Sequence, residues 1–155
     1  MDDAGSMQAV SEGLLSAVAY AEPRLQALSE EEARRPALKG GWSRKELIGH
    51  LIDSASNNHQ RFVRAALAGE LTFPGYDTAG NVRVQAVMEA EWPLLVMLWA
   101  SYNRYLAHGI ARLPEARLGA ECRIGDGKPV TLRFLVIDYL RHLKHHLGQI
   151  GLTQE

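Results

Sequence analysis

The stretch SRKELIGHLIDSASNNHQRFVRAALA, residues 43–68, decides the fold of this chain. It begins with Ser43 and, three residues later, Glu46, the spacing of a capping box, in which each side chain bonds the backbone N–H of the other at a helix start. Apolar residues then recur at helical spacing up to Gly69, and glycine commonly ends helices. The stretch therefore predicts one long amphipathic helix.

Three further stretches carry the same periodicity, and they cover residues 6–29, 82–111 and 131–149. We expect Pro23 to kink or split the first of them and Pro93 to kink or break the second, because proline removes a helical hydrogen bond. Residues 29–32, Ser-Glu-Glu-Glu, form a second capping box and predict a short helical turn that ends at Pro36 and Gly40.

The segments between these helices are predicted to be irregular. Residues 72–80 predict a loop by composition, and residues 114–130, rich in glycine and proline, predict a surface loop with room for one short extended piece. A chain of 155 residues has the size of one domain. We therefore expect an all-α fold, an antiparallel four-helix bundle spanning residues 1–155.

The charge and cysteine content excludes several classes of protein. Seventeen basic and 18 acidic residues leave a net charge of −1, with no block of like charge, so neither nucleic acid nor an anionic membrane is an expected partner. The single cysteine, Cys122, cannot form an internal disulfide or a cysteine-rich zinc site. The acidic start lacks a signal-peptide pattern, and the longest apolar run, residues 94–100, is too short to span a bilayer, so we expect a cytoplasmic protein.

The spacing of the six histidines is the feature of the sequence that bears most directly on chemical function. His142 and His146 are four residues apart on the last predicted helix, so their rings share one face at the edge of the apolar stripe. His50, on the helix over residues 43–68, borders a polar row of Ser54, Asn58 and Arg61. Three imidazoles from two helices would hold one metal ion and leave positions open, as catalytic sites do. A solvated helix face would show the same pattern, and each histidine taken singly has an ordinary structural explanation.

The histidine pattern differs from that of the zinc proteases. Their His-Glu-x-x-His motif supplies a general base next to the first ligand, whereas Leu143 occupies that position here. His59 lies about 180° from His50 on the same helix, so we expect it to take no part in a shared site.

Several segments together resemble one family of proteins. They are Gly41-Trp42-Ser43, residues 45–54, residues 57–65, Phe73-Pro74-Gly75-Tyr76 and residues 138–150, which end in His-x-x-His-His-x-x-Gln. Over residues 6–150 the chain closely resembles the DinB/YfiT-like superfamily. The resemblance implies a four-helix bundle, often dimeric, that binds a divalent metal ion such as Ni²⁺ or Zn²⁺ through the positions of His50, His142 and His146. It also implies chemistry on thiols or their conjugates.

For several other residues, the sequence allows both a functional and a structural role. Asp138 lies one turn before His142 and could accept its imidazole N–H, or it could be a solvated carboxylate. Arg61 and Asn58 are candidate substrate contacts, although bonds within their own helix would also explain them. Trp92, Leu95 and Trp99 suggest a homodimer face or, equally, the monomer core. Cys122 is expected to be a packed loop residue rather than a reactive thiol.

Two functions remain open at this stage. The first is a metal-dependent enzyme that acts on a small molecule, by hydrolysis or thiol transfer. The second is a non-catalytic, metal-binding helical bundle that works as a structural or binding module. Three ligands rather than four favour the enzyme, because the metal then keeps a free position.

Overall fold

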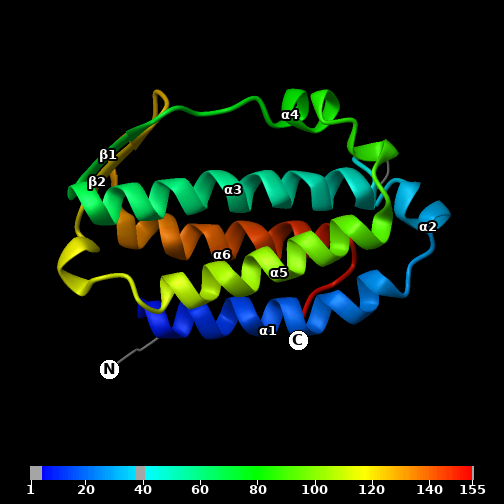
Figure 1. Ribbon diagram of the computed structural model, residues 1–155, viewed down its shortest axis with the longest axis horizontal. Helices are drawn as coiled ribbons and strands as arrows, with labels where there is room; N and C mark the ends of the chain where they lie inside the picture. Colours follow the sequence, from blue (N-terminus) through cyan, green and yellow to red (C-terminus); the bar gives the residue numbers. More distant parts are fainter. Residues whose placement is uncertain (1–4, 38–40, 155) are drawn as a thin grey trace.

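Four long helices lie side by side in the computed structural model, which describes residues 5–37 and 41–154 (Figure 1). They are α1 (Met7–Gln26), α3 (Arg44–Ala68), α5 (Trp92–Ile110) and α6 (Leu132–Gln149). The predicted four-helix bundle is confirmed. Gly40, expected to help end the short second helix, lies outside the described residues.

Both capping boxes form as their spacing predicts. The hydroxyl of Ser43 accepts from the N–H of Glu46, and the Glu46 carboxylate accepts from the N–H of Ser43 at 2.7 Å. Ser29 and Glu32 make the same pair at the start of α2 (Glu30–Arg34). At the other end of α3, Gly69 adopts a φ of 82°, the left-handed conformation that suits glycine. These local signals account for both ends of α3.

Pro23 does not split α1. The helix continues past it to Gln26, because tertiary packing holds the last turn: Leu25 is fully buried, and the indole N–H of Trp92 donates to the Leu25 carbonyl at 2.8 Å.

One predicted helix is wrong in its extent. Residues 82–111 do not form a single helix but the end of α4 (Thr78–Val84), a 3₁₀ turn (Val87–Glu89) and α5. The break falls before the expected position, around Ala86, which has a φ of 49°. Pro93 lies in the first turn of α5, where a helix needs no N–H, so it starts that helix instead of interrupting it.

A small three-stranded sheet occupies parts of the predicted loops. β1 (Glu70–Phe73) pairs in parallel with β2 (Glu121–Ile124), which pairs antiparallel with β3 (Val130–Thr131). These strands have two to four residues, too few for a periodic pattern to be visible in the sequence. Cys122 therefore lies in a strand, not in a loop, and it is fully buried.

The helices do not simply alternate in direction. α1 and α6 run one way, and α3 and α5 run the other way (Figure 1). This order requires the chain to return along α3 before α5 begins, and β1, the segment over residues 74–77 and α4 make that return. The crossover segment thus passes over α3 and contacts it through β1 and α4.

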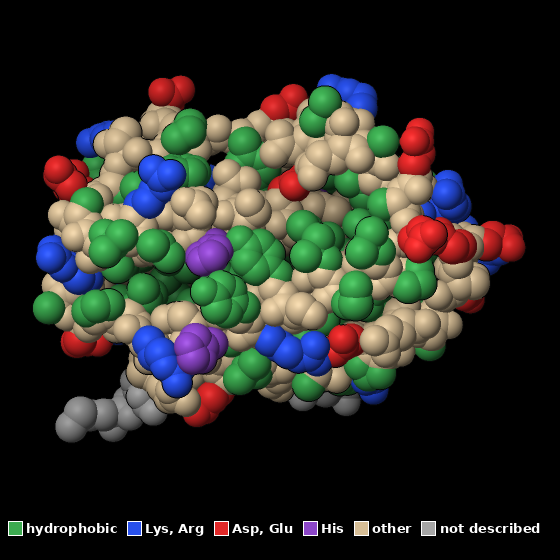
Figure 2. All heavy atoms as spheres, in the orientation of Figure 1, with side chains coloured by type: hydrophobic (Ala, Val, Ile, Leu, Met, Phe, Trp, Pro, Cys, Tyr) green, Lys and Arg blue, Asp and Glu red, His purple; other side chains and the backbone are tan. Residues whose placement is uncertain are grey.

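The aromatic residues of α5 belong to the core. Trp92 is 2% exposed and Trp99 is fully buried, and Leu95 is buried beside them, so these residues are not available to a second copy. The homodimer stays a prediction. Hydrophobic side chains nevertheless gather over α5 on the face shown in Figure 2. Leu94 and Met97 of α5 are exposed. Among the described helices, none has both the length and the apolar character needed to cross a membrane.

Candidate metal centre

Three histidine side chains converge between α3 and α6. His50 extends from the first half of α3, and His142 and His146 extend from successive turns of α6. The Nε2 atom of His142 lies 3.3 Å from Nε2 of His50 and 3.0 Å from Nε2 of His146. One ligand atom from each residue lies within 4.8 Å of the other two. The structure therefore brings together the three residues that the sequence selected.

The spacing of these nitrogens fits a shared ion. Zinc–nitrogen bonds of 2.0–2.1 Å in a tetrahedral site place neighbouring ligand atoms about 3.3 Å apart. The separations of 3.3 Å between His50 and His142 and of 3.0 Å between His142 and His146 are close to that value. In the described part of the chain, no carboxylate or thiol joins this group as a fourth ligand. The donor set is three imidazoles, which suit zinc and nickel.

Burial keeps the three imidazoles neutral. Removal from solvent lowers the pKa of His50 to about 4, and repulsion from the charged forms of His146 and His142 adds to this effect. Burial likewise lowers the pKa of His142 to about 4 and lowers the pKa of His146. A neutral imidazole has a free nitrogen lone pair, so the cluster is ready to bind a cation at neutral pH.

Gln149 orients one of the three imidazoles. Its side-chain oxygen lies 2.8 Å from Nδ1 of His146, and because that oxygen can only accept, Nδ1 must carry the proton. The Nε2 lone pair of His146 then points at the cluster. Nδ1 of His50 has no hydrogen-bond partner although it is buried, and the Trp42 ring packs edge-on against the His50 ring at 5.4 Å between centroids.

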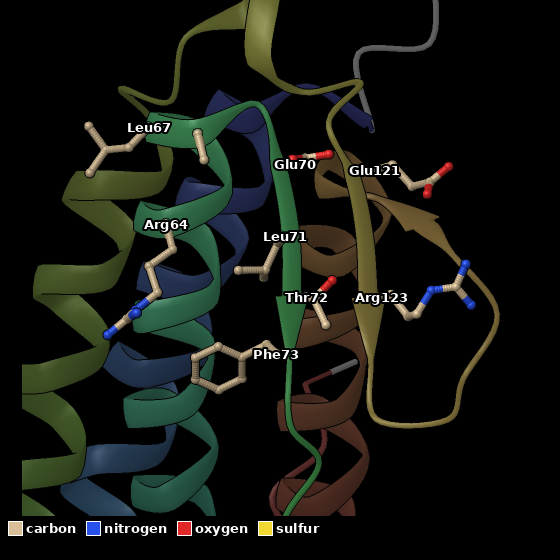
Figure 3. A pocket seen from close by; sticks show the side chains of 9 residues that line it. Arg64, Leu67, Glu70, Leu71, Thr72, Phe73, Glu121 and Arg123 are labelled. Carbon is tan, nitrogen blue, oxygen red and sulfur yellow. The ribbon is translucent and has the colours of Figure 1, made fainter.

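A pocket opens beside the cluster. It has a volume of about 220 Å³ and is lined by His146 and Gln149 from α6 and by Trp42 and Leu47 around the start of α3. A larger pocket of about 590 Å³ lies at the other end of α3, against β1 and β2 (Figure 3). Its wall carries Arg64, Phe73 and Arg123 but no histidine. We assign the chemistry to the smaller pocket, because reactive groups and not volume define a site.

The remaining histidines do not belong to the cluster, although the ring of His145 packs edge-on against that of His146 at 5.2 Å between centroids. Nδ1 of His59 lies 2.8 Å from the hydroxyl of Tyr102 on α5, on the opposite side of α3. His108 stacks on Tyr105. His145 is exposed, and its Nε2 atom lies 3.4 Å from the amide nitrogen of Gln149.

The other predicted site residues, Asp138, Asn58 and Arg61, are not part of the histidine cluster and differ in their hydrogen-bond partners. The Asp138 carboxylate accepts from Nε of Arg141 at 2.8 Å, and its charge acts on His142 only by raising that residue's pKa. Asn58 is buried and donates to the Ser54 carbonyl within its own helix. Arg61 is half-buried, and its Nε atom has no hydrogen-bond partner.

Sequence reasoning missed two residues of the centre. The i, i+3 spacing of His146 and Gln149 in the last helical turn is the signal that could have identified the hydrogen bond between them. Trp42 was visible only as the residue before the capping box, and no sequence pattern shows that its ring reaches His50.

Comparison with known proteins agrees with this architecture. The model of the DinB superfamily matches residues 15–150, which include all three histidines. The solved structure of YfiT from Bacillus subtilis, described as a probable metal-dependent hydrolase with an unusual four-helix bundle topology, superposes with a TM-score of 0.85. The two chains are 18% identical, and the match covers 94% of this chain and 83% of that one. No curated protein matches.

Proposed function

The chain belongs to the DinB superfamily, and we propose that it is a metal-dependent hydrolase of a small molecule, with His50, His142 and His146 as the metal ligands. The observation that carries the proposal is the convergence of three neutral Nε2 atoms beside an open pocket. Three protein ligands leave room for a water molecule or a substrate, the arrangement of catalytic rather than structural metal sites. The description of YfiT as a probable hydrolase supports the same reading.

A divalent ion at this position would supply Lewis acidity and would lower the pKa of a bound water toward neutrality. The chain's own residues prepare the site. Gln149 holds the tautomer of His146, and the ring of Trp42 and the side chain of Leu47 give the pocket an apolar wall. The three imidazoles are neutral and bring no negative charge, so the full charge of the ion would act on the substrate.

A protein nucleophile has no part in the proposed reaction. Cys122, the one cysteine, is buried in β2, and burial raises the pKa of its thiol. A thiol that is protonated and buried does not act as a nucleophile. If thiols take part, as the family resemblance implies, they come from the substrate. Asn58 and Arg61 remain the proposed substrate contacts on the α3 side, and the metal, nickel or zinc, is part of the proposal.

The test begins with metal analysis of protein purified without added metal or an affinity tag. The metal-loaded protein is then assayed with ester, amide and thioester substrates, and separately with small thiols plus electrophiles. His142→Ala is the metal-free control, and His59→Ala is the matched histidine control. We expect hydrolysis in the wild type and in His59→Ala, and none in His142→Ala.

Three outcomes would contradict the proposal. Hydrolysis that survives in His142→Ala would place the chemistry elsewhere. Turnover only in the presence of a thiol and an electrophile would identify a thiol transferase. A metal bound with no turnover in any assay would point to the non-catalytic bundle that the sequence also allowed.

A further inference from the structure

One side of α5 faces away from the bundle and carries no carboxylate, ammonium or guanidinium group. We call this row of exposed residues, which follow one another at the spacing of a single helical face, the outer stripe of α5: Leu94, Met97, Leu98, Ser101, Tyr105 and His108. Arg104 borders the stripe, but its guanidinium pairs with the Glu22 carboxylate on α1. The charge of Arg104 is therefore balanced within the chain.

The exposed apolar surface on this side of the molecule is large (Figure 2). Val63 and Leu67, one turn apart on α3, extend it, since Val63 and Tyr105 line the same cavity. These three residues and Leu94, Met97 and Leu98 expose between 43% and 76% of their surface. At roughly 200 Å² for each residue when fully exposed, the six present about 650 Å². The largest apolar patch of a typical monomer covers about 300–600 Å², so this surface has the size of an interaction site.

A cavity opens at the C-terminal end of the stripe, between α3 and α5. It has a volume of about 130 Å³, and its wall includes Val63, Tyr105 and Gly109. A Cβ atom added at Gly109 would meet nothing within 4 Å, so the cavity is open on this side. At about 30 Å³ for a water-sized group, it has room for about four such groups, as many as the carbon atoms of a leucine side chain. The stripe thus ends in a hollow, whereas Leu94 and Leu98 project at its other end.

The stripe is complementary to a second copy of itself. Ser101 lies at its midpoint, with Met97 four residues before it and Tyr105 four residues after it. Leu94 and His108 lie seven residues from Ser101 on either side. A twofold axis at Ser101 would therefore place Met97 against the partner's Tyr105 in an antiparallel pair of α5 helices. It would also place Leu94 against the partner's His108, about 10 Å from the axis, where the cavity opens.

We propose that the outer stripe of α5 is the interface of a homodimer, in which two antiparallel α5 helices cross at Ser101 and each copy places Leu94 at the cavity of the other. The short side chain of Ser101 allows the helices to approach closely, and no like charges meet. A stable interface buries about 800 Å² per partner, and the apolar area of about 650 Å² with the polar residues of the stripe reaches this size.

This interface differs from the one that the sequence suggested. Trp92, Leu95 and Trp99 are buried in the core, whereas the outer stripe lies on the opposite, exposed side of α5. The dimer leaves the metal centre accessible. His59 lines the cavity, and His50 lies about 180° away from it around α3. Each copy would therefore keep its own open pocket beside the three histidines.

Sedimentation velocity of the full chain over about 1–100 µM tests the proposal. We expect the wild type to reach about twice the 17.1 kDa mass of one chain and to dissociate on dilution. Ser101→Glu should raise the dissociation constant by about 100-fold or more, because two carboxylates would meet at the axis. Phe134→Glu is the matched control, since Phe134 is as exposed but lies on α6, which packs against α1 and α3. It should dimerise like the wild type.

A pair of variants tests the antiparallel arrangement. Met97→Glu and Tyr105→Lys should each weaken self-association by about 10- to 100-fold, because each places an unpaired charge in the interface. An equal mixture of the two proteins should form a 1:1 dimer, since the carboxylate at position 97 of one chain then meets the ammonium group at position 105 of the other. Within one helix these positions are about 12 Å apart, too far for that pair to form inside one chain.

Circular dichroism establishes that each variant is folded before its mass is measured. A wild type that stays at the mass of one chain at about 100 µM would overturn the proposal and leave this side of α5 to a different protein. Equal dissociation of Ser101→Glu and Phe134→Glu, or a dimer that survives both Ser101→Glu and Met97→Glu, would place the interface elsewhere. A mixture of Met97→Glu and Tyr105→Lys that stays monomeric would overturn the antiparallel arrangement.

Discussion

Two histidines on α3 show how position on one helix separates two kinds of site. His50 and His59 are nine residues apart and point to opposite sides of the helix. His50 faces α6, is 4% exposed and meets two further imidazoles. His59 faces α5, is half-buried and pairs with the hydroxyl of Tyr102. The same side chain thus belongs to a candidate metal centre on one face and is a structural hydrogen-bond partner on the other.

The difference lies in the partners that each face meets. The α6 face presents two further imidazoles, and three neutral imidazoles so placed can together hold one divalent cation. The α5 face presents a hydroxyl, which satisfies one ring nitrogen of His59. The following changes test this contrast, from the largest expected effect to the smallest.

The largest effect is expected from loss of a ligand. His50→Ala or His142→Ala should reduce bound metal from about one ion per chain to a small fraction, because two imidazoles hold a divalent ion far less tightly than three. His59→Ala should keep the wild-type content. Metal analysis after gel filtration measures both, and equal loss in the two sets of variants would contradict the contrast.

The next effect concerns Gln149. Gln149→Leu removes the acceptor that fixes the His146 tautomer, and we expect metal affinity to fall by about 10- to 100-fold. Competition with a chromogenic chelator measures the affinity. Gln154→Leu, near the same end of the chain but bonded to Ser16, is the control. An unchanged affinity in Gln149→Leu would show that the hydrogen bond has no role in metal binding.

Acid should destabilise the metal-free protein through the buried imidazoles. The pKa of His50 is about 4 in the folded chain, below the value of about 6.5 for an exposed histidine. The unfolded chain therefore binds more protons, so stability is retained above pH 6.5 and declines as the pH falls toward 4. Urea denaturation across this range should show a smaller decline in His50→Gln than in the wild type. An equal decline in both would remove His50 as a cause.

A smaller change in stability is expected on the α5 face. His59→Ala breaks the bond to Tyr102 and should lower the free energy of unfolding by about 1 kcal/mol. Tyr102→Phe removes the same bond from the other side, so the double variant should cost little more than either single one. Full additivity would show that the two groups act independently.

The smallest effect is expected from Asp138. Its carboxylate is engaged by Arg141, so Asp138→Asn should change metal affinity less than Gln149→Leu does, by no more than about threefold. The chelator competition gives both values. If Asp138→Asn lost as much metal affinity as Gln149→Leu, the result would show that Asp138 orients His142.

Local signals in the sequence predicted much of the fold and of the ligand set. The capping boxes at Ser29 and Ser43 and the left-handed Gly69 each act within one helical turn, so their residue types suffice to place helix ends. The same holds for the i, i+4 pair of His142 and His146. The extent of residues 82–111 was not predictable in this way, because the packing of Trp92 and the strained Ala86 decide where α5 begins.

The sequence by itself determined that four long helices form, where the two capping boxes lie and that His142 and His146 share one face, since these depend on periodicity and spacing along one chain. Only the tertiary structure decided which faces meet. It brought His50 to His142 across 92 residues, gave Gln149 its role, placed short strands in the apparent loops and returned the chain over α3 so that Gln85 bonds Asp53. Such contacts depend on how the whole core closes, and that information is not contained in any single segment.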